Sequence, residues 1–233
     1  MTEQRILCVV TNAGEYQAVG FRTGLWLGEL THFVDVAEEA GFVCDIASPA
    51  GGFVPIDPES LMMPKAADAV GFESAVQKRY RDRGFMDRLQ DTMPVSEADP
   101  ARYGAIYLAG GHGTMFDFTS DALAEVVGAF WDAGKIVSAV CHGPAGLLEA
   151  RDAAGKPIVG GRRVTGFSWR EEGLAERQEA VPFNLEERLE EAGADYSKAA
   201  LPFIEHVVED ERLITGQNPK SATAVAKAVL AHL

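Results

Sequence analysis

Short apolar runs along this chain are separated by segments in which apolar residues recur every three or four positions. Residues 6–11 and 42–48 are apolar runs typical of buried strands. Between them, residues 30–40 repeat apolar side chains at helical spacing, and Gly41 ends the predicted helix. A strand–helix–strand unit of this kind predicts a parallel sheet with right-handed crossovers.

The same alternation continues in the second half of the chain. Strands are predicted at residues 103–109 and 136–140, with an amphipathic helix over residues 123–131 between them. Towards the end of the chain the pattern predicts two more helices, a pair of strands around a turn, and a hairpin. The helices are residues 185–192 and a terminal helix opened by Asn218-Pro219, the paired strands are residues 206–208 and 213–215, and the hairpin lies around residues 157–165.

Residues 50–100 interrupt this alternation. Glycine and proline punctuate the first part, and the charged residues 68–91 have a helical pattern. The segment is too long for a simple connection, so it is predicted to be an insertion that covers one end of the sheet. The sequence therefore predicts a single α/β domain over residues 1–233: a flavodoxin-like parallel sheet sandwiched by helices on both faces, with a small helical insertion and a β-hairpin.

Composition restricts the class of partner. The chain has 47% hydrophobic and 24% charged residues, and its net charge of −14 is spread along the sequence. Nucleic acids and anionic membranes need a basic surface, so neither is expected as a partner. No segment approaches the ~20 apolar residues of a membrane span, and the start shows no signal-peptide pattern. Three widely spaced cysteines make no disulfide framework, so a cytoplasmic protein with reduced thiols is expected.

Cys141 is the strongest candidate for chemistry. It follows the apolar residues 136–140 and stands just before a Gly-Pro pair at 143–144, so it is predicted to lie at a sharp strand-to-helix corner. Parallel α/β folds bind ligands at this edge of the sheet. The start of the helix that follows is expected to lower the pKa of the thiol. Cys8 and Cys44 lie inside apolar runs and are interpreted as inert core residues.

A glycine-rich turn, Gly110-Gly111-His112-Gly113, follows the strand predicted at residues 103–109. Closely spaced glycines let the main chain approach a ligand and direct N–H groups at a developing oxyanion. The turn is not a dinucleotide fingerprint, because Phe116 stands where the third glycine would be, and it is not a P-loop. A plain turn is the alternative.

Two places along the chain offer carboxyl groups for acid-base work. Glu29 lies in the first turn of a predicted helix, beside the apolar stripe, where burial would raise its pKa. An exposed acid at a helix N-terminus is the alternative. Glu171 and Glu172 follow residues 165–169, and one of them could orient His142 as the third member of a triad. Solvent-exposed capping residues are the alternative for this pair.

Metal binding has little support in the sequence. The histidines are residues 32, 112, 142, 206 and 232, with no pair at ligand spacing and no Cys-x-x-Cys motif. Neither a metal nor a cofactor is therefore expected.

Six motifs, in this order, resemble the ThiJ/PfpI (DJ-one-like) superfamily, whose fold is akin to class I glutamine amidotransferases. They are residues 23–30 (TGLWLGEL), 47–52 (ASPAGG), 109–113 (AGGHG), 140–144 (VCHGP), 164–167 (VTGF) and 215–219 (TGQNP). The resemblance covers essentially the whole chain, and within the superfamily it points to the subgroup of glyoxalase III enzymes and heat-shock chaperones.

The resemblance implies a cofactor-free lyase of the D-lactate dehydratase (glutathione-independent glyoxalase III) type. Such an enzyme converts methylglyoxal, or a related small dicarbonyl, and water to a 2-hydroxy acid such as D-lactate through a cysteine hemithioacetal. Cys141 matches the nucleophile and His142 its neighbouring histidine. Glu29 matches the buried acid-base, and Glu172 best matches the third acid, with Glu171 the near alternative.

The same resemblance places oxyanion and substrate binding at Gly110, Gly111 and His112, with the backbone N–H groups of Gly111 and His142 as the donors. It also implies a homodimer. The larger chaperone members carry long extra segments and a metal-like site, and this compact chain shows neither.

Two other functions stay open at this point. One is a holdase chaperone or oxidative-stress sensor that uses the same cysteine, with an apolar patch at Met62-Met63-Pro64 and Phe72. The other is glutamine amidotransfer, for which the downstream histidine would be His206, with Glu209 as the nearest acid that follows it.

Overall fold

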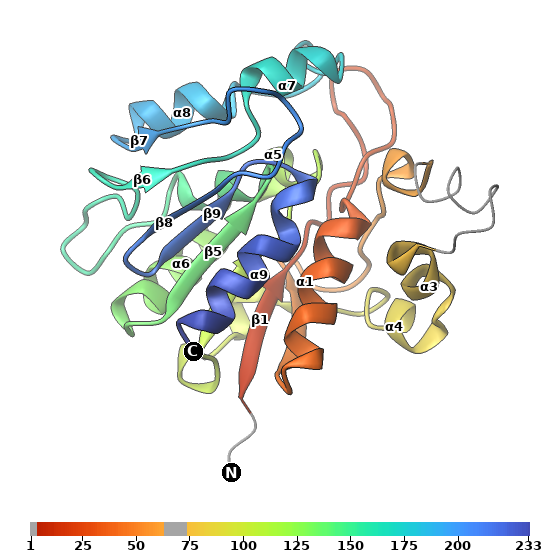
Figure 1. The fold of residues 1–233 in the computed structure, drawn as a ribbon, viewed down its shortest axis with the longest axis horizontal. Helices are drawn as coiled ribbons and strands as arrows, with labels where there is room; N and C mark the ends of the chain where they lie inside the picture. The colour runs from red at the N-terminus through yellow and green to blue at the C-terminus, as the bar shows by residue number, and fades with distance from the viewer. Residues whose placement is uncertain (1–3, 63–73) are drawn as a thin grey trace.

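A computed structural model describes residues 4–62 and 74–233. Over these residues the main sheet has seven strands in the order β3-β2-β1-β4-β5-β9-β8, and every neighbouring pair is parallel except β8 with β9 (Figure 1). The strands are β1 (Arg5–Val9), β2 (Val43–Ser48), β3 (Met93–Pro94), β4 (Ala105–Leu108), β5 (Ile136–Val140), β8 (Val207–Asp210) and β9 (Leu213–Gly216). The predicted flavodoxin-like α/β fold is confirmed.

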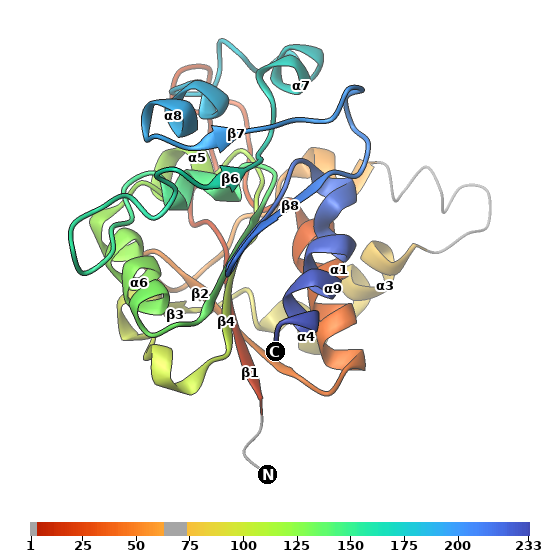
Figure 2. The same cartoon turned by 60° about the vertical axis from the view of Figure 1, so that its left-hand side comes forward.

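Helices cover both faces of the sheet. α1 (Leu27–Glu39) and α9 (Ala222–Ala231) lie side by side on one face, and α6 (Asp121–Asp132) lies on the other (Figure 2). Alternate side chains of β1 enter the two cores: Ile6 packs towards α1 and α9, whereas Leu7 packs towards α6. Because both faces are buried, the central strands need an uninterrupted apolar sequence, which explains the runs.

The remaining elements lie in the connections between the strands of the main sheet. They are the α-helices α3 (Ala75–Arg81), α4 (Arg83–Asp87), α5 (Thr114–Asp117), α7 (Trp169–Leu174) and α8 (Leu185–Glu191), the 3-10 turns η1 (Pro58–Leu61), η2 (Val95–Glu97), η3 (Pro100–Arg102), η4 (Gly143–Leu147) and η5 (Pro219–Ser221), and the paired short strands β6 (Arg163–Val164) and β7 (Asp195–Tyr196). None of the helices in the described ranges is both long and apolar enough to cross a bilayer.

From the segment between β2 and β4, α3 packs against α1 and α4 packs against α3 (Figure 1). Arg79 of α3 binds Asp35 of α1 at 2.6 Å, and Arg88 binds Glu38 of the same helix at 3.1 Å. The helical pattern predicted for residues 68–91 is borne out by α3 and α4, while its first part falls on residues 63–73, outside the described ranges.

The hairpin predicted around residues 157–165 is wrong. β6 pairs in parallel with β7, about thirty residues later in the chain, instead of folding back on its neighbour. Ile158 and Val159 are buried in a turn and pack into the core on the α6 side, so their apolar character reflects burial and not strand pairing. The hairpin of this fold is β8–β9, whose pairing the sequence predicted correctly.

Candidate active site

Cys141 is held at a strained backbone corner directly after β5. Its φ angle is +58°, a left-handed conformation that residues with a side chain adopt rarely. Its N–H donates to the carbonyl of Gly216 at 2.9 Å, and its own carbonyl accepts from the N–H of Phe167 at 2.7 Å. The corner predicted for the cysteine is therefore confirmed, although the helix that follows is the five-residue 3-10 turn η4.

The thiol is not acidified by this corner. Burial of Cys141 and the adjacent Glu29 carboxyl raise the pKa of the thiol well above its ordinary value, and the N–H of His142 only partly opposes them. The predicted lowering of this pKa is wrong, because the short turn η4 supplies few aligned peptide dipoles and the side chain is 3% exposed. A reaction at this sulfur therefore needs a base that takes its proton.

Glu29 lies in the first turn of α1 and is completely buried. Its Oε2 accepts the N–H of Gly110 at 2.7 Å, and its Oε1 is buried without a hydrogen-bond partner in the described part of the chain. Burial raises the pKa of Glu29 to about 8, an effect that its interactions with the Cys141 thiol and the Gly110 N–H reduce only in part. The predicted burial next to the apolar stripe, with a raised pKa, is confirmed.

His142 and Glu172 complete a relay from the sulfur. The Nδ1 atom of His142 lies 3.4 Å from Sγ of Cys141, and its Nε2 lies 2.8 Å from Oε2 of Glu172. Burial alone would raise the pKa of Glu172, but the two adjacent histidines, His142 and His112, hold it well below its usual range. The structure thus brings together Cys141, His142 and Glu172, and Glu172 rather than Glu171 contacts the histidine.

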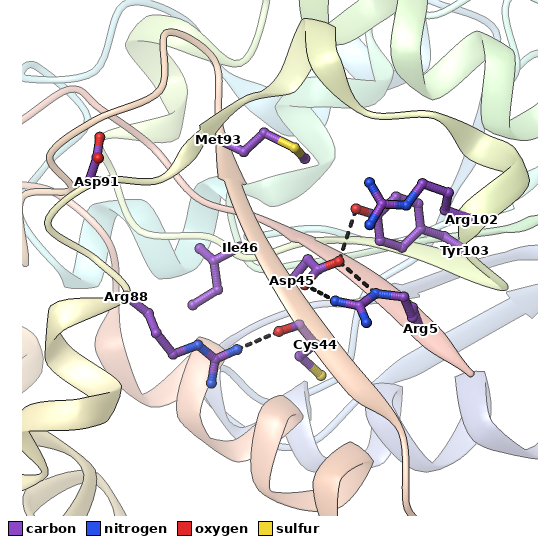
Figure 3. A pocket seen from close by; sticks show the side chains of 9 residues that line it. All are labelled: Arg5, Cys44, Asp45, Ile46, Arg88, Asp91, Met93, Arg102 and Tyr103. Carbon is purple, nitrogen blue, oxygen red and sulfur yellow. Dashed lines mark hydrogen bonds and ion pairs between the residues drawn. The ribbon is translucent and has the colours of Figure 1, made fainter. Parts of the chain in front are cut away.

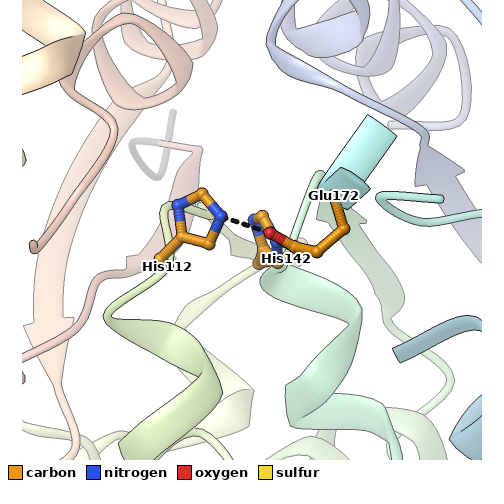
Figure 4. A group of neighbouring side chains, drawn as sticks. All are labelled: His112, His142 and Glu172. Carbon is orange, nitrogen blue, oxygen red and sulfur yellow. Dashed lines mark hydrogen bonds and ion pairs between the residues drawn. The ribbon is translucent and has the colours of Figure 1, made fainter. Parts of the chain in front are cut away.

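His112 is bound to the same carboxylate. Its Nε2 lies 2.7 Å from Oε1 of Glu172, and its ring centroid is 4.2 Å from that of His142. Figure 4 shows both rings and Glu172 converging from different segments of the chain. An ionised carboxylate can only accept, so both Nε2 atoms carry the hydrogen and Nδ1 of His142 is left to accept a proton from the thiol.

Glu171 has a different task, which the sequence did not reveal. Its buried carboxylate accepts five hydrogen bonds: two from Ser168 and one each from the Phe203 N–H, the Gln217 amide and the Asn218 amide. These bonds fix the first turn of α7, which carries Glu172, against the segment after β9. The motif at residues 215–219 is the signal that could have pointed to this anchor.

We expect Glu171→Gln to lower the free energy of unfolding by about 3 kcal/mol, because an amide NH₂ group would face buried donors. The kcat should fall as well, since Glu172 would lose its position. Urea unfolding and steady-state kinetics measure the two effects, with the exposed Glu179→Gln as the matched control. An unfolding free energy within about 0.5 kcal/mol of the control, the usual size of surface effects, would contradict this role.

The glycine-rich turn requires its glycines. Gly111 has φ +111°, and a Cβ there would lie 2.3 Å from the carbonyl oxygen of Gly24. A Cβ on Gly110 would lie 2.7 Å from Oε2 of Glu29. The turn therefore lets the backbone approach both the segment just before α1 and the carboxyl group of Glu29, and its role in binding an oxyanion stays a prediction.

We expect Gly111→Ala to lower the free energy of unfolding by about 3 kcal/mol, because the new methyl group would meet backbone atoms and the φ angle would be strained. Gly155→Ala is the matched control: its φ is +77° but nothing lies within 4 Å of the added Cβ. Its loss should be about 1 kcal/mol. Urea unfolding decides, and equal losses in the two variants would show that the close contact is unimportant.

Aromatic side chains also pack near His142. The ring of Phe167 lies 4.4 Å from that of His142, and Phe203 lies 6.1 Å from Phe167. Sequence reasoning missed both as site residues, although Phe167 belongs to the motif at residues 164–167. His206 was considered for amidotransfer, but the hydrogen-bond partner of its Nε2 atom is Oγ of Ser197, at 3.4 Å.

A separate cavity of about 380 Å³ lies beside β2 (Figure 3). Arg5 and Tyr103 both bind Asp45 there, and Arg88 binds the carbonyl of Cys44. Its polar groups thus largely satisfy one another, and none of the predicted site residues lines it. Cys44 and Cys8 are both buried, as predicted.

Comparison with known proteins shows the family of the chain. The DJ-1/PfpI family model matches residues 24–232. A probable glutathione-independent glyoxalase of Schizosaccharomyces pombe is 33% identical over 93% of each chain, and Glyoxalase 3 of Candida albicans is 29% identical over 97% of each. Among solved structures, Rapid Encystment Protein 24 KDa of Francisella tularensis has a TM-score of 0.89 at 35% identity, covering 97% of each chain. Glyoxalase III of Candida albicans has a TM-score of 0.85 at 27% identity, covering 98% of this chain and 96% of that one.

Proposed function

This chain belongs to the DJ-1/PfpI family, and from that premise we propose that it is a glutathione-independent glyoxalase that converts methylglyoxal and water to lactate. The observation that carries the proposal is the buried carboxyl of Glu29 beside the thiol of Cys141, with one carboxyl oxygen that accepts no hydrogen bond from the described residues. Its relatives include proteins named as glyoxalases of this kind, and the fold is shared over nearly the full length.

The first step would be addition of sulfur to the aldehyde. Nδ1 of His142 takes the proton from Sγ of Cys141, and the thiolate forms a bond to the aldehyde carbon while the C=O electron pair moves to oxygen. The N–H groups of Gly111 and His142 would stabilise that oxyanion, which then receives the proton from His142. Glu172 keeps the histidine oriented and stabilises its charged form. The product is a hemithioacetal.

Glu29 would then move a proton between two carbons. Its carboxylate takes the hydrogen from the carbon bound to sulfur, giving an enediolate, and returns that proton to the neighbouring carbon. His142 moves the remaining proton between the two oxygens, which leaves a thioester. Water hydrolyses the thioester, releasing the 2-hydroxy acid and restoring the thiol. A pKa of about 8 suits a group that must both accept and donate a proton near neutral pH.

The test is lactate formation from methylglyoxal by the purified protein with no glutathione present. Lactate should appear in amounts equal to the methylglyoxal consumed, as measured by nuclear magnetic resonance. Chiral analysis of the product tests the finer assignment to D-lactate. Cys44→Ala, which removes a thiol outside the site, is the control and should retain activity. Consumption of methylglyoxal without lactate would overturn the proposal.

A holdase is the second candidate. Leu201 is 62% exposed and Ile204 41%, on a segment that also carries Phe203, and Met62 of the predicted patch is 65% exposed. The rest of that predicted patch, residues 63–64 and Phe72, lies outside the described residues. Two measurements distinguish the functions. If Cys141→Ala still suppresses client aggregation and the wild type forms no lactate, the holdase is favoured.

The single domain, the homodimer and the cytoplasmic location stay predictions. Sedimentation of the purified protein would test the homodimer: a mass near twice the chain mass of 25.0 kDa is expected.

A further inference from the structure

His112, His142 and Glu172 form a compact cluster, here called the His-His-Glu cluster. One ligand atom from each residue lies within 4.8 Å of the other two, and all three side chains are buried. Among the described residues this is the one group of three or more histidine, cysteine or acidic side chains that meets such a criterion. The residues come from three separate segments, and Figure 4 shows them facing a common point.

We propose that the His-His-Glu cluster binds a zinc ion, and that the bound ion inhibits the enzyme. Two imidazole nitrogens and one carboxylate oxygen are a ligand set that Zn²⁺ uses where one coordination position stays open for water. A single carboxylate charge with two neutral rings also suits a divalent ion in a buried site. This inhibition rests on the proposed function, whereas the binding does not.

Small movements would open the position for the ion. Ligand atoms about 2.0–2.1 Å from a tetrahedral zinc are roughly 3.3 Å apart. Nε2 of His112 now lies 2.7 Å from Oε1 of Glu172, and Nε2 of His142 lies 2.8 Å from Oε2, so the carboxylate needs to withdraw by about half an ångström and to turn one oxygen towards the ion. The two nitrogens are at most 4.8 Å apart, so the rings need to approach by no more than about 1.5 Å.

The thiol is excluded from this site. Sγ of Cys141 faces Nδ1 of His142, whereas the cluster uses Nε2 on the opposite edge of the ring. Zinc would therefore be held without the cysteine, in contrast to the usual preference of Zn²⁺ for thiolate.

The same geometry explains why the ion would inhibit. A metal takes the lone pair of Nε2, so the hydrogen that now sits on Nε2 has to move to Nδ1 or leave the ring. With hydrogen on Nδ1, His142 cannot accept the proton of the Cys141 thiol. The ion also takes Glu172 away from its role of orienting the ring. No electron transfer is involved, and removal of the ion restores the original hydrogen bonds.

Calorimetric titration of the untagged protein with ZnCl₂ tests the binding. We expect one ion per chain for the wild type and for Cys141→Ala, and at least ~10-fold weaker binding for His112→Gln and for Glu172→Gln. His232→Gln is the matched control, because His232 pairs with Glu209 at the surface, and it should bind like the wild type. Binding that is lost in Cys141→Ala and kept in His112→Gln would overturn the proposal, as would no binding at all.

Anomalous scattering from zinc-soaked wild-type crystals tests the position without any variant. A peak among the three ligand atoms is expected, and a peak elsewhere only would overturn the proposed site. For inhibition, Zn²⁺ should reduce lactate formation over the same concentrations at which it binds, and a chelator should reverse the loss. Full activity of the zinc-loaded protein would overturn the inhibition. A protein that binds zinc at the cluster but never forms lactate would instead refute the proposed function.

Discussion

Cys141→Ser should lose at least about 10³-fold in kcat/KM for methylglyoxal, the larger of the two strongest effects we expect. The hydroxyl group is smaller than the thiol and fits the same corner at φ +58°. It is a far weaker acid and its oxygen is a poorer nucleophile than sulfur, so His142, 3.4 Å from the sulfur it replaces, should activate it much less at neutral pH. Lactate formation measured by nuclear magnetic resonance gives the result.

The control for this variant is the loss of a thiol elsewhere. Cys44→Ala removes a buried sulfur that lies outside the site and should leave kcat within about twofold of the wild type. The fold of Cys141→Ser should also persist, because the hydrogen bonds at this corner are made by its backbone. Comparable turnover by Cys141→Ser and the wild type would rule out covalent catalysis by this residue.

Glu29→Gln should lower kcat by about 10²- to 10⁴-fold with little change in KM, because the amide can neither take nor return the proton that moves between the substrate carbons. In the wild type, kcat should rise with pH and level off above the Glu29 pKa of about 8, since the first carbon deprotonation needs the carboxylate. If the kcat of the variant still rose with pH and levelled off near pH 8, the titrating group would be one other than Glu29.

The same carboxyl should also make stability depend on pH. Its pKa is about 8 in the folded protein against 4.5 as its reference value. Between these values the folded state binds one more proton than the unfolded state, so this group makes the protein less stable as pH rises from 4.5 to 8. The full effect is on the order of 4 kcal/mol, and it is constant above pH 8.

Urea unfolding at pH 5 and pH 8.5 measures this contribution. An amide mimics the protonated carboxyl, so Glu29→Gln should unfold much like the wild type at pH 5 and be clearly more stable than the wild type at pH 8.5. All other titrating groups are the same in the two proteins, so their contributions cancel in the difference between the two free energies of unfolding. Equal free energies of unfolding for the wild type and the variant at both pH values would mean that Glu29 has an ordinary pKa in the folded state.

Local pattern was sufficient for the main elements. The central strands are buried on both faces, so each needs an unbroken apolar run that is visible in the sequence, as at residues 136–140. The corner at Cys141 was equally local, because a strand that stops at a glycine and a proline fixes where the side chain lies. The hairpin misassigned around residues 157–165 shows the limit: an apolar pair looks the same in a strand and in a buried turn.

Long-range docking decided the rest of the site. Glu171 and Glu172 are neighbours on the first turn of α7, and only the packing of that helix sends one to His142 and the other to the five donors around it.

The sequence by itself determined the α/β alternation, the backbone corner at Cys141 and the glycine turn, because each depends on residues close together in the chain. The tertiary structure alone decided the raised pKa of the Cys141 thiol and the convergence of His112, His142 and Glu172. Burial and the approach of Glu29 from a distant part of the chain raise this pKa, whereas the cluster joins segments 30 to 60 residues apart, so neither feature can be seen in a local sequence pattern.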